Sequence, residues 1–215
     1  MVTIDPNKPL PDHTKLDYDE CCAKLILEEL FPERYNQLVL SDKPDLQGNE
    51  VGIEVTNAND PKTQEALSNW IKANCATDTV KKNQYIERMA QLGVTYTGGI
   101  QSWPGELQTF QWTEDAVKRK IEKLKSGIYE YFPRYELFVF TDTWFYEDIV
   151  DQARDFFFSE VVCPWYKTIY VLSEGLALHT FETDTQEYSY LQIDTAKQTD
   201  RNYRARRMVE EGEQE

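Results

Sequence analysis

Two acidic residues that lie nine positions apart are the side chains of this chain best suited to chemistry. Asp45 follows Pro44 at the start of a short apolar run, and Glu54 stands in the middle of the run Val51–Thr56. If the two runs form a hairpin, the carboxylates approach each other, and they repel unless a cation joins them. Carboxylate oxygens bind Mg²⁺, and a bound ion can polarise a phosphodiester and activate a water. We therefore expect Asp45 and Glu54 to be ligands of Mg²⁺ or Mn²⁺.

The run Val51–Thr56 is rich in β-branched residues, which predicts a buried strand. A charge in the centre of such a strand is costly when it is unpaired, so Glu54 must have a partner. That partner is either a metal ion at a functional site or a lysine in a structural ion pair. Asp45 has an alternative too, because an aspartate that follows proline is also an ordinary turn residue.

The order Pro44-Asp45 and then Glu54-Val55-Thr56 resembles the paired motif of the PD-(D/E)XK nuclease superfamily, which has the restriction-endonuclease-like fold. Glu20-Cys21-Cys22-Ala23 is similar to the helical Glu-x-x-Ala that precedes this motif in many members. The resemblance covers roughly residues 17–56 and 114–141. It implies a metal-dependent endonuclease or phosphodiesterase acting on DNA, in which Asp45 and Glu54 hold the metal and Glu20 assists.

The chain departs from the family pattern at the lysine, whose position two residues after the glutamate is occupied by Thr56. Thr56 cannot supply a cation. Some members of this fold carry the lysine on the second core helix, which corresponds here to a predicted helix over 114–132. Lys120 flanks the apolar stripe of that helix, so the resemblance makes it the first replacement candidate, with Lys123 and Lys125 behind it. A helix face rich in lysine is also typical of a solvated surface.

The periodicity of apolar residues predicts alternating helices and strands, and hence a mixed α/β sheet with helices on its faces. The expected helices are 17–30, 61–74, 79–92, 114–132 and 144–158. The expected strands are 36–40, 51–56, 135–141, 167–172, 176–181 and 187–193, with a loop or hairpin over 94–112. This order is similar to a restriction-endonuclease-like sheet with a helical insertion and extra C-terminal strands.

One domain is expected. An extended N-terminal arm covers 1–14, a single α/β domain covers 15–194 with an insertion at 57–113, and a charged tail, mobile or weakly helical, covers 195–215.

The net charge of −15 opposes unselective binding to nucleic acid, so DNA as a partner requires local positive charge or a divalent cation. Four cysteines without a Cys-x-x-Cys pair make a structural zinc site improbable and suggest a reducing compartment. The sequence has neither an apolar signal core nor a membrane-spanning run, which predicts a cytoplasmic protein without a membrane partner.

The remaining candidates are weaker. His179 has no evident partner and His13 lies in the arm, so neither is expected to be a ligand. Trp103, Phe110 and Trp112 could stack bases or cover the sheet or a subunit surface. The aromatic segments 95–112 and 144–166 could bury a homodimer surface or cap the core. The rival to a nuclease is a binding or interaction protein on the same fold that has lost catalysis.

Overall fold

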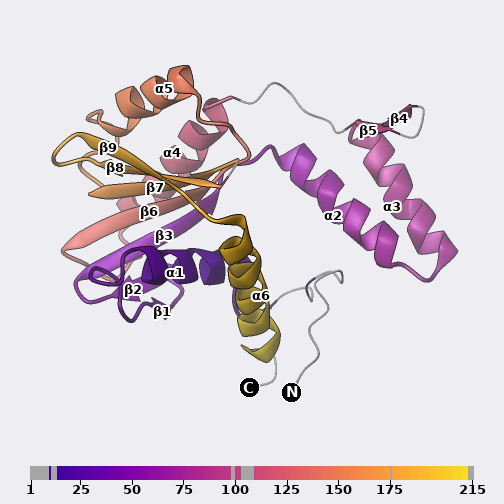
Figure 1. Cartoon of the computed structure of the whole chain (residues 1–215), viewed down its shortest axis with the longest axis horizontal. Coiled ribbons are helices and arrows are strands. Elements are labelled where there is room, and N and C mark those ends of the chain that lie inside the picture. The colour runs from indigo at the N-terminus through magenta and orange to yellow at the C-terminus, as the bar shows by residue number, and fades with distance from the viewer. Residues whose placement is uncertain (1–9, 11–13, 98–99, 103–108, 175, 213–215) are drawn as a thin grey trace.

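A mixed sheet of seven strands forms the centre of the computed structural model, which describes residues 10, 14–97, 100–102, 109–174 and 176–212 (Figure 1). The strand order is β1-β2-β3-β6-β7-β8-β9. The strands of this sheet are β1 (Val39–Leu40), β2 (Leu46–Gly48), β3 (Val51–Asn57), β6 (Arg134–Phe140), β7 (Thr168–Ser173), β8 (Ala177–Glu182) and β9 (Glu187–Gln192). β3, β6 and β7 run parallel, and the strands on either side pair antiparallel. The predicted α/β class with a mixed central sheet is confirmed.

Of the six helices in the described residues, one covers one face of this sheet and two cover the other. The helices are α1 (Tyr18–Leu30), α2 (Pro61–Cys75), α3 (Thr79–Gln91), α4 (Gln111–Lys125), α5 (Glu147–Phe157) and α6 (Thr195–Gly212). On one face α1 buries Ile26 and Leu27 against Ile53 and Val55 of β3. On the other face α4 and α5 pack on β6, β7 and β8. Alternate residues of β3 therefore point to opposite layers, which sends Glu54 towards α4 and not towards α1.

The helix predicted over 114–132 begins and ends earlier than expected. α4 covers Gln111–Lys125, and Gly127 follows with a φ of 70°, a conformation that favours glycine and ends the helix. Ile128 lies within the predicted helix but beyond its observed end, and it is 59% exposed. Apolar residues at helical spacing therefore continue in the sequence past Gly127, although the helix ends before it.

Of the two alternatives expected for the C-terminal tail, mobile or weakly helical, the structure shows a helix, since 195–212 form α6. Ala205 and Val209 of α6 bury Cys21 and Cys22 of α1. Arg201 is 1% exposed and its guanidinium donates to Glu29 of α1 over 2.8 Å. The periodicity was hidden because arginine and glutamine occupy part of the inward face of this helix.

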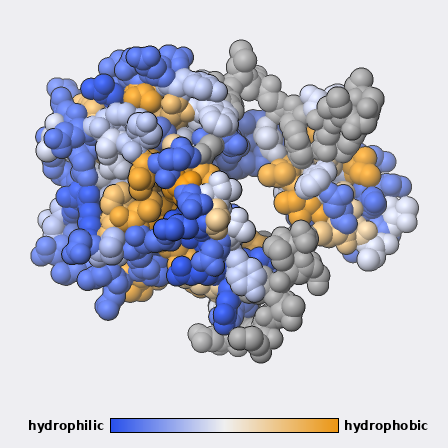
Figure 2. Space-filling view, in the orientation of Figure 1, coloured by the Kyte–Doolittle hydropathy of each residue, from blue (hydrophilic) through white to orange (hydrophobic). Residues whose placement is uncertain are grey.

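The insertion forms a separate helical unit. α2 and α3 pack on each other around Ala66, Met89 and Val94, and together they project from the sheet (Figure 1). The expected hairpin in this region consists of β4 (Thr95–Thr97) and β5 (Ile100–Ser102). Figure 2 shows apolar side chains gathered on the side of this unit that faces the rest of the molecule.

Most of the described aromatic residues in the segments 95–112 and 144–166 belong to the hydrophobic core or pack against it. Phe110 is 1% exposed and lies edge-on to Phe156 and Phe157, so it caps the core and does not stack bases. Tyr166 is fully buried. Trp103 and His13 lie outside the described residues. No helix in the described part of the chain is both long and apolar enough to cross a membrane.

Candidate functional site

Asp45 and Glu54 meet across the β2–β3 hairpin. The antiparallel register pairs Leu46 with Ile53, which places Asp45 next to Glu54 at the end of β2. Asp45 Oδ2 accepts a hydrogen bond from the backbone N–H of Val55 over 2.7 Å, so its side chain is held against β3. The Asp45 side chain is 13% exposed and that of Glu54 is fully buried. Asp45 is therefore more than a solvated turn residue.

Lys120 of α4 joins the two carboxylates. Its Nζ lies 2.9 Å from Asp45 Oδ2 and 2.6 Å from Glu54 Oε2. β3 directs Glu54 towards α4. On that helix Lys120 comes three residues after the buried Val117 and directly before the buried Ile121. The structure thus brings together the two predicted metal ligands and the lysine that the sequence placed first among the replacements.

Tyr129 is a fourth member that the sequence analysis missed. Its hydroxyl donates to Glu54 Oε2 over 3.1 Å. Tyr129 follows the end of α4, so helical periodicity gave no reliable direction for it. Glu54 Oε2 therefore accepts one hydrogen bond from the charged ammonium of Lys120 and another from the neutral hydroxyl of Tyr129.

The charges in this cluster depend on each other. Burial alone would lower the pKa of Lys120, but the carboxylates of Glu54 and Asp45 outweigh it and raise that pKa, so Lys120 is an ammonium at neutral pH. Burial raises the pKa of Glu54, and Lys120 opposes the rise. Burial and the negative charge of Glu54 raise the pKa of Tyr129, which keeps its hydroxyl protonated as a donor.

Glu54 Oε1 is buried and has no hydrogen-bond partner among the described residues. Leaving a buried carboxylate oxygen unsatisfied is costly, and such groups are rare in native proteins. Lys120 and Tyr129 both contact the other oxygen, Oε2. Oε1 therefore retains the capacity to accept from a further donor or to contact a cation.

Glu20 borders the cluster from α1. Asp17 caps that helix by accepting from the backbone N–H groups of Asp19 and Glu20, which fixes the first turn. Glu20 and Asp45 line one polar hollow of about 380 Å³, shared with Asp17 and Asp42. Burial, followed by the charges of Asp45 and Asp17, raises the pKa of Glu20 to about 8. Glu20 thus lies within electrostatic range of the cluster, and its carboxyl group is protonated at neutral pH.

Thr56 and Gly52 lie on the same face of β3 as Glu54. Thr56 is half-buried two residues beyond Glu54, on the strand that pairs with β6. A Cβ on Gly52 would come within 2.6 Å of Pro44 Cγ and 3.0 Å of Phe132 Cδ2. Only glycine lets Pro44, and with it Asp45, lie this close to β3.

Two other basic residues of α4 are engaged elsewhere. Lys118 pairs with Glu114 at 2.8 Å, and Lys125 pairs with Glu122 at 2.7 Å. Lys125 is therefore not a second cation of the site. These surface pairs cancel much of the positive charge of α4, as the alternative of a solvated face predicts.

A metal ion would have few protein ligands here. Across the described ranges no group of three or more His, Cys, Asp or Glu side chains is arranged to hold a metal ion. Mg²⁺ nevertheless tolerates one or two carboxylates, because it retains several waters and accepts oxygens from its substrate. Asp45 and the unsatisfied Oε1 of Glu54 fit that minimal requirement.

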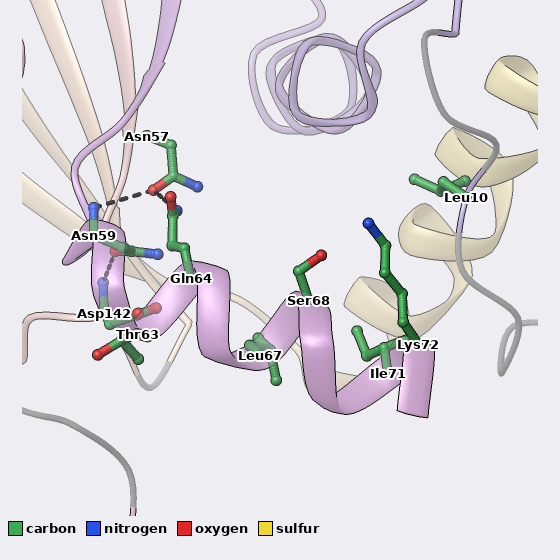
Figure 3. A pocket seen from close by; sticks show the side chains of 10 residues that line it. All are labelled: Leu10, Asn57, Asn59, Thr63, Gln64, Leu67, Ser68, Ile71, Lys72 and Asp142. Carbon is green, nitrogen blue, oxygen red and sulfur yellow. Dashed lines mark hydrogen bonds between the residues drawn. The ribbon is translucent and has the colours of Figure 1, made fainter. Parts of the chain in front are cut away.

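A larger cavity, about 430 Å³, lies away from the cluster at the carboxyl end of β3 (Figure 3). Hydrogen bonds fix several of its polar side chains: Asn57 Oδ1 accepts from the backbone N–H of Asn59 over 3.1 Å and from Gln64 Nε2. The backbone N–H of Asp142 donates to Asn59 in turn. These contacts tie the start of α2 to the ends of β3 and β6, which accounts for them structurally.

Two further polar groups were not anticipated. His179 was expected to lack partners, but its Nε2 lies 3.0 Å from Ser173 Oγ and its Nδ1 lies 2.9 Å from the Tyr188 hydroxyl. Glu136 is fully buried and paired with Arg34 at 2.6 Å and with Arg134. The partners of His179 lie on the neighbouring strands β7 and β9, whereas Glu136 is paired with Arg34 from the loop after α1 and with Arg134 of its own strand. Contacts between different elements cannot be read from the pattern of a single strand.

Comparison with known proteins adds no relative. No family model, curated protein or solved structure matches this chain. Its function must therefore be argued from its own residues.

Proposed function

We propose that this chain is a metal-dependent phosphodiesterase that hydrolyses DNA at the Asp45–Glu54–Lys120 cluster. The observation that carries the proposal is the convergence of these three side chains around Glu54, one oxygen of which is buried without a partner. Removing two carboxylates and a lysine from water costs free energy, and a purely structural role returns little stability for it. Such groups gather at functional sites.

The arrangement of elements supports a restriction-endonuclease-like fold. α1 precedes the three neighbouring strands β1, β2 and β3, and α4 precedes β6, which lies beside β3 and parallel to it. This is the order that the resemblance of the sequence implies, with α2, α3 and the β4–β5 hairpin as the insertion. The strands β7, β8 and β9 extend the sheet beyond β6.

Each residue has a distinct role in the proposed reaction. Asp45 and Glu54 would hold Mg²⁺ or Mn²⁺, which supplies Lewis-acid activation of the phosphodiester and of a water when bound. Lys120 would hold positive charge next to the oxygens on which negative charge develops. Glu20, with a pKa of about 8, would accept or return a proton near neutral pH. Thr56 would contribute a neutral hydroxyl where a lysine is expected.

The test is cleavage of plasmid and single-stranded DNA with Mg²⁺ or Mn²⁺. We expect the wild type to cleave, EDTA to stop the reaction, and Glu54→Gln to slow it about 100-fold or more, the usual cost of losing a group that stabilises charge in the transition state. Glu122→Gln is the matched control, because Glu122 lies on the solvent side of the same α4 and is 70% exposed. Well-folded wild type that cleaves with neither metal rejects the enzyme.

The second candidate is a binding protein on the same scaffold without catalysis. Lys120 itself favours it, because its ammonium lies between the carboxylates where a metal ion would be held. Thr56 and the net charge of −15 point the same way. Titration with Mn²⁺ separates the two: an unchanged melting temperature, together with DNA binding but no cleavage, favours the binding protein.

A further inference from the structure

An aromatic pocket of about 410 Å³ lies at the carboxyl ends of β6 and β7, apart from the carboxylate cluster. The segment after β6 supplies Trp144 and Tyr146, whose rings are nearly parallel with centroids 6.2 Å apart. β9 supplies Tyr190 to the same lining. These three rings are 41%, 65% and 66% exposed, in a molecule that buries Phe110 and Phe157 almost completely. Ligand sites of open α/β sheets occur at the carboxyl ends of their strands.

The floor of this pocket is ordered and electrically neutral. His179 is 4% exposed, and both of its ring nitrogens are engaged, by Ser173 and by Tyr188. Ser173 Oγ also lies 3.2 Å from the carbonyl oxygen of Ala177, to which it donates. Ser173 Oγ therefore accepts from Nε2–H, and Nδ1 accepts from the Tyr188 hydroxyl. Burial lowers the pKa of His179 to about 4, so the imidazole carries no charge at neutral pH.

The charge of the lining is negative. Glu147 and Glu174 are exposed and border the pocket, and its described lining includes neither lysine nor arginine. Two carboxylates at the rim disfavour phosphate groups and hence nucleotides. Trp144, Tyr146 and Tyr190 add three aromatic rings to the lining, each with a negative face.

The geometry points to a binding site for an organic cation with an apolar shell, that is, a methylated ammonium group. Aromatic faces attract such a cation, tryptophan most strongly, and they also bury its methyl groups. Glu147 and Glu174 supply the opposite charge without fully desolvating it. The same chemistry occurs in a small molecule such as choline and in a trimethyl-lysine side chain of a partner protein.

The experiment titrates the full chain with choline and with a trimethyl-lysine peptide, followed by NMR and tryptophan fluorescence. The neutral isostere 3,3-dimethylbutan-1-ol has the shape of choline without its charge. We expect saturable binding of at least one cation, binding of the isostere at least tenfold weaker, and tenfold weaker cation binding in Trp144→Ala. Glu174→Gln, which leaves the aromatic rings unchanged, should weaken cation binding two- to fivefold without affecting the isostere.

Tyr131→Ala is the matched control, because Tyr131 is 85% exposed and lies outside the pocket. Choline that binds better than the peptide identifies a small-molecule site, and the reverse order identifies a site for a modified protein. Equal binding of choline and its isostere overturns the proposal. So does the absence of saturation by either cation at tens of millimolar, or tighter binding of a nucleoside than of both cations. None of these outcomes depends on DNA cleavage.

Discussion

Lys120 is the residue on which the interpretation of the site turns, because it both satisfies the two carboxylates and occupies the space between them. Its side chain is 12% exposed. A buried ion pair adds little net stability when it is compared with apolar residues of the same shape. Removing only one partner, however, leaves uncompensated charge and is strongly destabilising. Lys120 therefore separates a structural pair from a site that accepts an external cation.

The first prediction concerns Lys120→Met, which retains most of the length of the side chain and removes its charge. We expect a loss of about 3–5 kcal/mol in the free energy of unfolding without metal, because Asp45 and Glu54 then face each other unpaired. Saturating Mg²⁺ or Mn²⁺ should restore more of the stability than it adds to the wild type. Urea unfolding with and without metal measures both effects. Lys118→Met, at a position that is 47% exposed, serves as the control and should change stability by less than about 0.5 kcal/mol. Equal metal responses in Lys120→Met and in the wild type would contradict a cation site.

The second prediction concerns the pH dependence that Glu20 introduces. Its pKa is about 8 in the folded chain, against 4.5 for an unperturbed glutamate. The folded state thus binds this proton more tightly than the unfolded state does, and the associated stability is lost as pH rises from about 4.5 to about 8. Since Glu20 is only half-buried, we expect a difference of about 1–2 kcal/mol between the wild type and Glu20→Gln across that range.

Thermal unfolding of both proteins between pH 5 and pH 9 tests this expectation, with Glu114→Gln as a control on the surface of α4. Added Mg²⁺ should shift the Glu20 transition to lower pH, because a nearby cation favours the ionised carboxylate. Parallel pH profiles for the wild type and Glu20→Gln would show that Glu20 titrates normally, away from the influence of Asp45.

At this scale the sequence predicted the members of the cluster that lie on regular elements. Asp45 and Glu54 follow from the period of two along a strand and the length of the hairpin, and Lys120 follows from its angle around a helix. Tyr129 and the pairing of His179 were missed for one physical reason: their positions depend on how elements pack, not on periodicity within one element.

Among the elements, the β2–β3 hairpin determines whether the site exists. Its two carboxylates meet because Pro44 packs against Gly52, where any larger residue would collide with the proline ring. The third prediction is that Gly52→Ala displaces Pro44 and Asp45 and reduces stability by about 1–3 kcal/mol, the usual range for overpacking. DNA cleavage and the metal response should fall together, because Asp45 would no longer align with Lys120.

The matched control for this prediction is Gly48→Ala in the same hairpin. A Cβ there meets only the side-chain ends of Val51 and Leu38, at 3.0 Å and 3.1 Å, and these can move. We expect a smaller loss of stability and an intact metal response in this variant. A normal metal response in Gly52→Ala would show that the approach of Pro44 does not position Asp45.

The helices show where sequence patterns become ambiguous. The bounds expected for α2 and α3 agree with the structure to within a residue, because acidic caps precede both helices. The end of α4 was predicted too late, because the spacing of apolar residues does not show that the backbone turns at Gly127. α6 was read as a charged tail because its buried residues include the long polar side chains of Gln198, Arg201 and Arg206. Arg201 donates to Glu29 of α1, and Arg206 donates to Glu210 of α6 itself.

At the scale of the whole molecule, the net charge of −15 constrains any function on nucleic acid. α4, the helix with the lysine-rich face expected from the sequence, has two of its lysines paired with its own glutamates. DNA would therefore be held by a divalent ion and by Lys120, and not by a broad positive surface. The composition predicts this restriction, which stays a prediction. It could not show which lysines remain available, because that depends on side-chain pairing.

The insertion offers a test of how the molecule is divided. α2 and α3 have their own small apolar cluster around Ala66 and Met89, and this cluster is distinct from the two layers that cover the main sheet. Ala58 and Phe110, by contrast, belong to the core on the α4 face. The unit between these two residues is thus attached to the sheet mainly at its ends.

The fourth prediction is that residues 60–108 can be replaced by a flexible Gly/Ser linker without unfolding the sheet. Surface insertions tolerate such changes because the closure entropy of a loop varies only slowly with its length. We expect one cooperative thermal transition, a melting temperature within a few degrees of the wild type, and an unchanged response to Mn²⁺ in the Asp45–Glu54–Lys120 cluster. A deletion that also removes Ala58 and Phe110 is the contrasting variant and should unfold, because both side chains fill the core. Loss of the metal response in the first deletion, with the sheet intact, would instead make the insertion part of the site.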